Sequence, residues 1–173
     1  MVLRSSPARD VGSLGYDEFV AARWTSLYRT AYLLTANHAD AEDLAQTALV
    51  KAYLSWSKVA GAASPDAYVR RILTNAFLSS RRPLRVSRER LVDQPPEPAT
   101  VGPPTDDRLV LWPHIAALSP RQRAVVVLRF YEDLSEHQIA ETLGCSPGTV
   151  KSTASDALKI LRSRMESTEG ATS

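Results

Sequence analysis

Cysteine, long apolar runs and a signal sequence are scarce or missing in this chain of 173 residues. Its single cysteine, Cys145, excludes an internal disulfide framework and is typical of a reducing compartment. No apolar run approaches the roughly 18 residues that a membrane span needs. The segment 1–15 lacks the apolar core of a signal peptide, so we expect a disordered tail there and a cytoplasmic protein.

The chain also lacks a large excess of positive or negative charge and a cluster of catalytic residues. The formal net charge is only +2, so the total charge says little about partners. The histidines at positions 38, 114 and 137 have no metal-ligand spacing, and no glycine-rich phosphate loop or nucleophile elbow occurs. Carboxylates between 40 and 43 could hold a cation in principle, but helix capping and partner docking explain them more simply. We therefore predict that the protein is not an enzyme and has no catalytic residue, no metal and no other cofactor.

The apolar residues of the first half recur at helical spacing, and no alternating strand pattern is present. We expect a first helix from 16 to 35, followed by a second helix that Asp40 caps. The apolar stripe of this second helix comprises Leu44, Ala48, Leu49, Ala52, Tyr53 and Trp56. After the loop "KVAGAAS", Ser64 and Pro65 supply the N-cap and the first-turn proline of a third helix. These three helices can enclose one core.

A proline-rich stretch divides the chain. The segment "DQPPEPATVGPP" has five prolines in twelve residues, and proline removes backbone donors and restricts the chain to extended forms. The sequence therefore predicts an all-α protein of two small helical domains, at 16–85 and 109–166, joined by a flexible linker at 86–108. A short tail follows at 167–173. In the second domain, Pro113 either kinks the first helix or lies in its first turn.

Capping signals near the end of the chain outline two helices joined by a tight turn. Ser135 and Gln138 form a capping box, and Gly144 ends the helix because glycine accepts the left-handed conformation at little cost. Ser146 caps the next helix, and Val150 can pack it onto the first, which is the pattern of a helix-turn-helix. Short hydroxyls and cations suit phosphate oxygens and base edges. The outer face of the second helix presents Thr149, Lys151, Ser152, Thr153, Ser155, Asp156, Lys159 and Arg162.

Charge is unevenly distributed along the first domain. The segment 67–85 carries five arginines and no acidic residue, whereas 40–43 is acidic. This asymmetry favours a basic surface for an anionic polymer, although ordinary solvated helix faces would also show it.

Two motif blocks occur in order on either side of the proline-rich connector, "DAEDLAQTALVKAYLSW" and "LSPRQRAVVVLRFYEDLSEHQIAETLGCSPGTVKS". Together they resemble the extracytoplasmic-function (ECF) sigma factors, the small two-domain group of the bacterial sigma-70 family, in a SigE-like subgroup. The resemblance covers residues 16–166 apart from the linker. It implies that 16–85 is sigma domain 2, which binds core polymerase and recognises and melts the −10 region. It likewise implies that 109–166 is sigma domain 4, which recognises the −35 element.

The resemblance assigns contacts with core polymerase to the first block. The stretch "DAEDLAQTALVKAY" is similar to the segment that docks on a coiled coil of the polymerase clamp, which implies contacts by Asp43, Gln46 and Thr47. Many relatives carry an acidic residue where this chain has Thr47. Leu44 and Leu49 are expected to be internal supports rather than contacts.

Promoter contacts are implied by two further matches. The segment "SPDAYVRRILTNAFLSSRR" is similar to the element that recognises the −10 region, and the loop 57–64 to one that receives an unstacked base. The implied −10 contacts are Arg70, Arg71, Asn75, Arg81 and Arg82. For Trp56 and Tyr68, core packing is the simpler interpretation.

The helix 147–165 is similar to the family's reader of the −35 element. The implied contacts are Thr149, Lys151, Ser152, Ser155, Asp156 and Lys159. Relatives usually carry a basic residue at position 156. The carboxylate of Asp156 would repel a phosphate but could accept a hydrogen bond from a cytosine amino group.

Other functions remain open on the sequence. A stand-alone helix-turn-helix regulator would use its first domain to sense a ligand or dimerise, and a weaker alternative is an interaction protein that binds polymerase without promoter choice. The first domain shows no recognisable effector pattern, and its third helix is basic, which favours the sigma factor. The expected partners are core RNA polymerase through its clamp coiled coil, promoter DNA and, where one inserts between the domains, an anti-sigma factor. No membrane insertion is expected.

Overall fold

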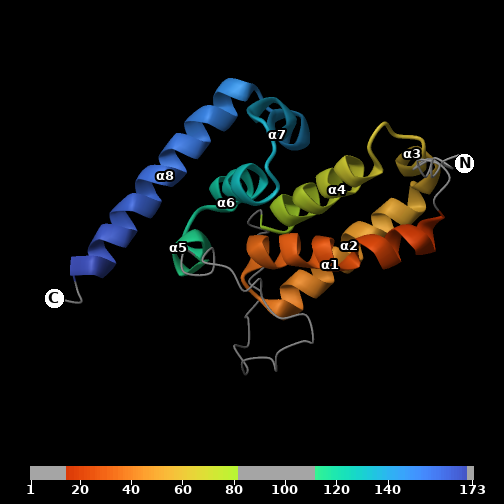
Figure 1. Cartoon of the computed structure of the whole chain (residues 1–173), viewed down its shortest axis with the longest axis horizontal. Helices are drawn as coiled ribbons and strands as arrows, with labels where there is room; N and C mark the ends of the chain where they lie inside the picture. The colour runs from red at the N-terminus through yellow and green to blue at the C-terminus, as the bar shows by residue number, and fades with distance from the viewer. Residues whose placement is uncertain (1–14, 82–111, 171–173) are drawn as a thin grey trace, which may run out of the picture.

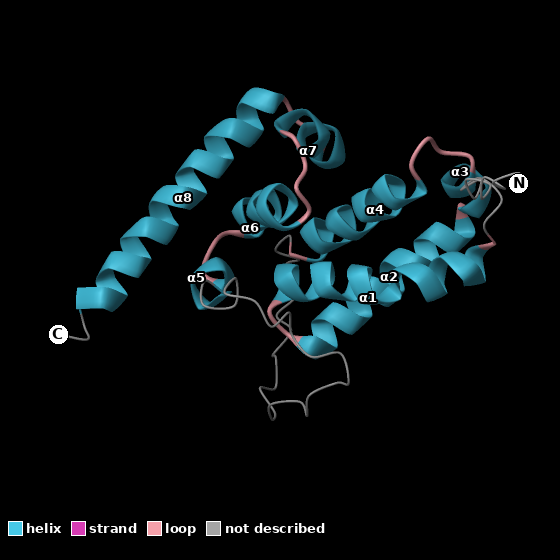
Figure 2. Ribbon diagram, viewed as in Figure 1, coloured by secondary structure: helices cyan, strands magenta, loops and turns pink. Residues whose placement is uncertain are grey.

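The computed structural model describes residues 15–81 and 112–170, and every regular element in these ranges is a helix (Figures 1 and 2). The predicted all-α class is therefore confirmed. The predicted linker at 86–108 and the residues Arg82 and Leu109 lie outside the described ranges.

The first half contains four helices: α1 (Tyr16–Thr35), α2 (His38–Leu54), α3 (Trp56–Ala60) and α4 (Pro65–Ser80). The bounds of α1 and the start of α4 agree with the sequence prediction. α2 packs against both α1 and α4, and the three helices share one core (Figure 1). The largest fully buried side chains of this core are Leu34, Val59, Val69, Leu73 and Phe77. Burying each such side chain contributes about 1.5–3 kcal/mol.

Three details of the first half differ from the sequence prediction. Asn37, not Asp40, caps α2, because the Asn37 side chain accepts a hydrogen bond from the Asp40 N–H at 3.0 Å. Asp40 instead lies in the first turn, where its negative charge favours the helix dipole. The segment predicted as a loop is partly helical, because α3 ends only at Ala60. Tyr53 is 61% exposed and does not belong to the buried stripe of α2.

The second half contains α5 (Trp112–Ala116), α6 (Pro120–Val126), the π-helical turn η3 (Val127–Tyr131), α7 (Glu136–Leu143) and α8 (Pro147–Gly170). Pro113 lies in the first turn of α5, where the missing N–H would have no helical partner in any case. The predicted cap at Ser119 is present, since its hydroxyl accepts a hydrogen bond from the Gln122 N–H at 3.3 Å. Residues 167–170, predicted as part of a tail, continue α8.

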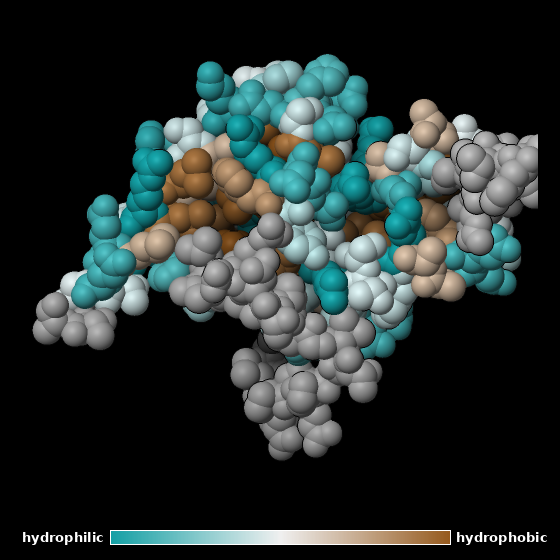
Figure 3. Space-filling view, in the orientation of Figure 1, coloured by the Kyte–Doolittle hydropathy of each residue, from teal (hydrophilic) through white to brown (hydrophobic). Residues whose placement is uncertain are grey.

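α8 packs against the rest of the molecule along one side only. An apolar groove runs between α8 and the helices beside it, and its brown surface is visible in Figure 3. The groove is lined by Leu33, Ile115, Val126, Val127, Phe130, Tyr131, Leu158 and Leu161. The apolar face of α8 is thus turned inward, which leaves its polar face directed at solvent.

The two halves of the chain are in contact with each other. α7 lies against α4, and α6 and η3 lie against α1 (Figure 1). Ala124 and Val127, from the second half, belong to the same buried cluster as the core residues of α1, α2 and α4. The sequence does not predict this contact, because a proline-rich connector indicates only that two helical units can move apart.

Candidate functional site

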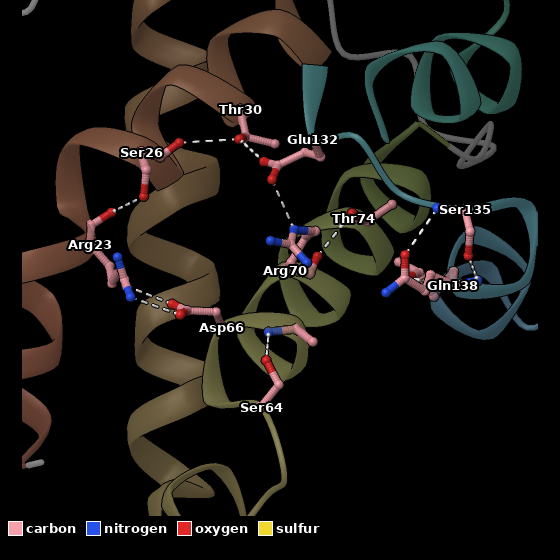
Figure 4. Close-up of polar contacts among 12 residues, drawn as sticks. Arg23, Ser26, Thr30, Ser64, Asp66, Arg70, Thr74, Glu132, Ser135 and Gln138 are labelled. Atoms are coloured by element: carbon pink, nitrogen blue, oxygen red, sulfur yellow. Dashed lines mark hydrogen bonds and ion pairs between the residues drawn. The ribbon is translucent and has the colours of Figure 1, made fainter. Parts of the chain in front are cut away.

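The helix-turn-helix formed by α7 and α8 begins, turns and continues at local hydrogen bonds that the sequence predicts. Ser135 Oγ accepts a hydrogen bond from the Gln138 N–H at 3.2 Å, and Gln138 Oε1 accepts one from the Ser135 N–H at 2.9 Å (Figure 4). Gly144 has φ 66° and ends α7 in the left-handed conformation. Ser146 Oγ then accepts a hydrogen bond from the Thr149 N–H at 3.2 Å and starts α8. The helix-turn-helix is therefore confirmed.

A small core fixes the angle between these two helices. Ile139 and Val150 are fully buried and face each other from α7 and α8, with Ala140 and Ala154 in the same cluster. Small residues at 140 and 154 let the two helix backbones approach closely. Cys145 is partly buried against this cluster, which agrees with its expected apolar role.

We expect that replacing Ser135 with alanine lowers the free energy of unfolding by about 1 kcal/mol, because the Gln138 N–H in the first turn of α7 loses its acceptor, the Ser135 hydroxyl. Urea unfolding followed by circular dichroism measures this loss. Ser163→Ala, at an exposed position on α8, is the matched control and should change stability by less than about 0.5 kcal/mol. Equal losses in both variants would contradict the capping assignment.

The polar face of α8 holds the predicted −35 residues, and all six are exposed: Thr149, Lys151, Ser152, Ser155, Asp156 and Lys159. Their spacing places them along the solvent side of the first half of the helix. The Ser152 hydroxyl donates to the Thr149 carbonyl at 3.0 Å, so its oxygen can still accept from a ligand. The carboxylate of Asp156 lies 3.8 Å from the Lys159 ammonium, which partly offsets the negative charge of Asp156.

The structure separates the predicted −10 residues into two groups. Arg71 and Asn75 are exposed on α4. Arg70 instead pairs with Glu132 of the second half, at 3.1 Å. Arg81 lies 3.4 Å from Asp40 and above the Phe77 ring, so it also serves the structure of the first half.

The predicted polymerase contacts lie on the outer face of α2. Asp43, Gln46 and Thr47 are exposed, whereas Leu44 and Leu49 are buried as expected. Gln46 Nε2 donates to Glu42 Oε1 at 3.3 Å, which orients the amide along the helix.

Sequence reasoning missed the apolar continuation of this face. Val50, Tyr53 and Leu54 are 57%, 61% and 78% exposed, and exposed apolar side chains grouped in this way are informative because they form a patch. Thr47 lies four residues after Asp43, Val50 lies three residues after Thr47, and Leu54 lies four residues after Val50. At these spacings the side chains lie on one side of the helix. A second stripe at that spacing, offset from the buried one, was the signal that could have revealed them. We call Asp43, Gln46, Thr47, Val50, Tyr53 and Leu54 the outer strip of α2.

Trp56 and Tyr68 pack as the simpler interpretation expected. Both are partly buried against the core of the first half. The Trp56 ring makes edge contacts with Tyr16 and tilted contacts with Phe19, at centroid distances of 5.4 Å in each case.

Arg123 is a partly buried cation that the sequence did not single out. Its guanidinium donates to the carbonyls of Leu34 and Ala116 at 2.7 Å and to that of Leu118 at 3.1 Å. Leu34 lies in the last turn of α1, so the arginine satisfies a terminal carbonyl of the first half from within α6. Burial, together with the nearby charge of Arg81, lowers the pKa of Arg123 below its usual range.

Within residues 15–81 and 112–170, no three His, Cys, Asp or Glu side chains gather closely enough to hold a metal ion. None of the helices in the described part of the chain is long and apolar enough to span a membrane.

Comparisons with known proteins cover both halves of the chain. Residues 21–85 match the family described as Sigma-70 region 2, and residues 114–161 match Sigma-70, region 4. The RNA polymerase sigma-E factor of Streptomyces avermitilis is 40% identical over 160 residues, covering 89% of this chain and 87% of that protein. The ECF RNA polymerase sigma factor SigL of Mycobacterium tuberculosis is 32% identical, covering 85% of this chain and 84% of that protein.

Two solved structures share the fold. The sigma factor RpoE, in complex with the anti-sigma factor NepR from Bartonella quintana, superposes with a TM-score of 0.67 at 26% identity, over 87% of this chain and 96% of that one. CnrH in complex with the cytosolic domain of CnrY superposes with a TM-score of 0.59, over 92% and 94% of the two chains. At 19% identity, the second likeness concerns the fold alone.

The fold and the exposed polar face of α8 define a two-part helical protein of the helix-turn-helix class. More narrowly, the chain belongs to the ECF sigma factors of the sigma-70 family and is SigE-like. Sigma factors are transcription initiation factors rather than catalysts.

Proposed function

We propose that this chain binds core RNA polymerase through the outer strip of α2 and directs promoter-specific initiation through α4 and α8. One observation carries the proposal. The chain exposes two helix faces that its own packing leaves unused, a mixed polar and apolar face on α2 and a hydroxyl- and cation-rich face on α8. A protein that must join a protein partner to DNA requires two such surfaces of different chemistry.

The composition of the outer strip suits a protein partner. Protein interfaces combine an apolar centre with a polar rim. Here Val50 and Leu54 supply apolar area, and Asp43 and Gln46 supply directional hydrogen bonds beside it. A helical coiled coil of the polymerase clamp can pack along such a strip, because the side-chain ridges of one helix fit into the grooves of another.

The face of α8 suits the major groove of DNA. A recognition helix of a helix-turn-helix enters that groove with its N-terminal residues toward the bases. Thr149 and Ser152 lie in the first two turns of α8 and carry short hydroxyls, and Lys151 can reach a phosphate or a guanine edge. We assign this face to the −35 element, and the exposed Arg71 and Asn75 of α4 to the −10 region.

Reconstituted transcription tests the proposal. Core polymerase with the purified chain should give run-off transcripts from a small set of genomic promoter fragments, and core polymerase alone should not. A stand-alone regulator, the second candidate, would instead protect a palindromic operator without polymerase. Tight palindrome binding together with no effect on start-site choice would reject the sigma assignment.

We expect the replacement of Lys159 with alanine to reduce the salt dependence of −35 binding by about 0.9 in log–log slope, because one phosphate contact and its released counterions are lost. The assay titrates salt against binding of the chain, assembled with core polymerase, to a −35 duplex. Lys58→Ala removes the same charge at an exposed position on α3 and should leave the slope unchanged. If the slopes of the two variants are the same, Lys159 does not contact a phosphate.

We further propose that the protein works in the cytoplasm beside the polymerase and is held inactive by an anti-sigma factor. The likeness to RpoE, which was solved with the anti-sigma factor NepR, supports the second point. Purification of the tagged chain from its own cells tests for such a partner. An anti-sigma factor should co-purify with the chain in the fraction that lacks core polymerase. Recovery of polymerase alone under every growth condition would count against it.

A further inference from the structure

Glu132 joins the two halves of the molecule with a single carboxylate. It directly follows η3, and its side chain lies in the space between α1 and α4 (Figure 4). One oxygen accepts a hydrogen bond from the hydroxyl of Thr30 in α1, and the other accepts one from Arg70 Nε in α4, at 3.1 Å. The Glu132 and Arg70 side chains are only 18% and 23% exposed. Ion pairs screened from solvent in this way are stronger than those on an open surface.

The backbone around Glu132 holds this carboxylate in place. The Glu132 N–H donates to the Val127 carbonyl at 3.1 Å, and the Leu134 N–H donates to the Leu128 carbonyl at 3.0 Å. Between them, Asp133 adopts φ 53°, a left-handed conformation that aspartate tolerates better than most residues. The turn is therefore fixed at both ends, and Glu132 needs little further ordering to reach Thr30 and Arg70.

Other contacts bring the same surfaces together. Arg123 donates across the boundary to the Leu34 carbonyl, and Val127 is buried in the core of the first half. Beside them, α7 faces α4 across a cleft that has Arg71 on one wall and Gln138 and Glu141 on the other. The side of α4 that carries Arg70 is thus turned toward the second half, and Arg71 lies at the exposed edge of the same cleft.

We propose that Glu132 is an intramolecular latch, which holds the two halves closed and withholds Arg70 from promoter DNA. The inference rests on the proposed function, because it takes α4 as the −10 surface. A DNA phosphate and the Glu132 carboxylate both bind a guanidinium by charge-assisted hydrogen bonds, so they compete for Arg70. The carboxylate is part of the same chain and has a high effective concentration. Productive promoter binding therefore requires the halves to separate, and the latch sets the cost of that separation.

Distance measurements on the full chain test the latch. Spin labels are placed at Ala22→Cys on α1 and Ser163→Cys on α8, both exposed positions, with Cys145 replaced by alanine. Glu132→Gln keeps the shape of the side chain and removes its charge. We expect the ratio of open to closed molecules to rise about tenfold or more, because a hydrogen-bonded charge pair is lost. Initiation at limiting core polymerase should rise with it.

Asp66→Asn is the matched control. Asp66 lines the same cavity and also pairs with an arginine, Arg23 at 2.7 Å, but both partners belong to the first half. The control removes one negative charge from the same space without touching the boundary, so it should leave the distances unchanged. The exchange Arg70→Glu with Glu132→Arg should restore the closed distances, although it removes the DNA contact.

Each outcome decides a separate point. Unchanged distances in Glu132→Gln, or equal opening in Asp66→Asn, would overturn the latch. Opening without any gain in initiation would overturn its inhibitory role. If neither the wild-type chain nor Glu132→Gln supports promoter-specific initiation, the proposed function fails, whereas the distances still report whether Glu132 holds the halves together. Circular dichroism spectra that match the wild type exclude unfolding as the cause of any opening.

Discussion

Replacing Val50 with glutamate is expected to weaken binding of the chain to core polymerase about thirtyfold or more, the scale of a central interface residue. Val50 lies in the middle of the outer strip of α2, and 57% of it is exposed in the free protein. If an apolar surface of a polymerase helix covers this part of the strip, the introduced carboxylate must lose its hydration without gaining a partner. Burying an unpaired charge is costly even at a partly wet interface. The expected loss is therefore larger than that from deleting the apolar contact alone.

Titration of core polymerase against the fluorescently labelled chain gives the dissociation constant. The isolated chain should keep its helical content and stability, because Val50 lies outside the buried core and glutamate is a good helix former. Ala22→Glu adds the same charge at an exposed position on α1 and serves as the control. Equal affinity of both variants for core polymerase would remove the outer strip from the interface.

The polar end of the same strip should respond more weakly. Replacing Asp43 and Gln46 with alanine removes hydrogen bonds without burying a new charge, and a typical net hydrogen bond contributes about 1 kcal/mol. The double variant should therefore bind core polymerase less tightly than the wild type but better than Val50→Glu. This order separates an apolar centre with a polar edge from a purely polar contact.

The features that the sequence predicts correctly are set by residues close together in the chain. The capping box joins Ser135 and Gln138, which are three positions apart, and Gly144 needs only its own backbone to end α7. The first turn of α4 likewise follows from Ser64 and Pro65. Each signal acts over one turn of helix, so packing elsewhere cannot alter it. The helix-turn-helix and its exposed face are therefore predictable from the amino-acid sequence alone.

The errors arise where a local signal is ambiguous or the deciding contact is distant. Asn37 and Asp40 are three residues apart, and both are good N-cap residues. The sequence alone does not say which of them occupies the N-cap position of α2. Tyr53 fits the spacing of the buried stripe, but it lies near the end of α2, beyond the cover of the core. The pair of Arg70 and Glu132 joins residues 62 positions apart, across two units whose contact no helical pattern encodes.

The second large effect is expected on the DNA side. Replacing Lys151 and Ser152 together with alanine should reduce initiation at a promoter with an intact −35 element about tenfold or more, because a good base contact contributes roughly 1–3 kcal/mol of discrimination. Both residues are exposed in the second turn of α8, and neither is part of the core that joins α8 to α7. The helix-turn-helix should therefore fold as before and lose only its contacts with DNA.

Promoters that differ only in the −35 element separate base reading from simple attraction to phosphate. The double variant should lose most of its initiation activity at the preferred −35 sequence and little at unfavourable −35 sequences. The difference in activity between the two kinds of promoter should therefore become smaller. Ser163→Ala with Arg164→Ala removes one hydroxyl and one cation about twelve positions further along α8, so it tests for a general effect of composition. A uniform loss on every −35 sequence would mean that Lys151 and Ser152 position the protein on the backbone without reading bases. A loss that grows with the quality of the −35 element is the result that base contacts by α8 require.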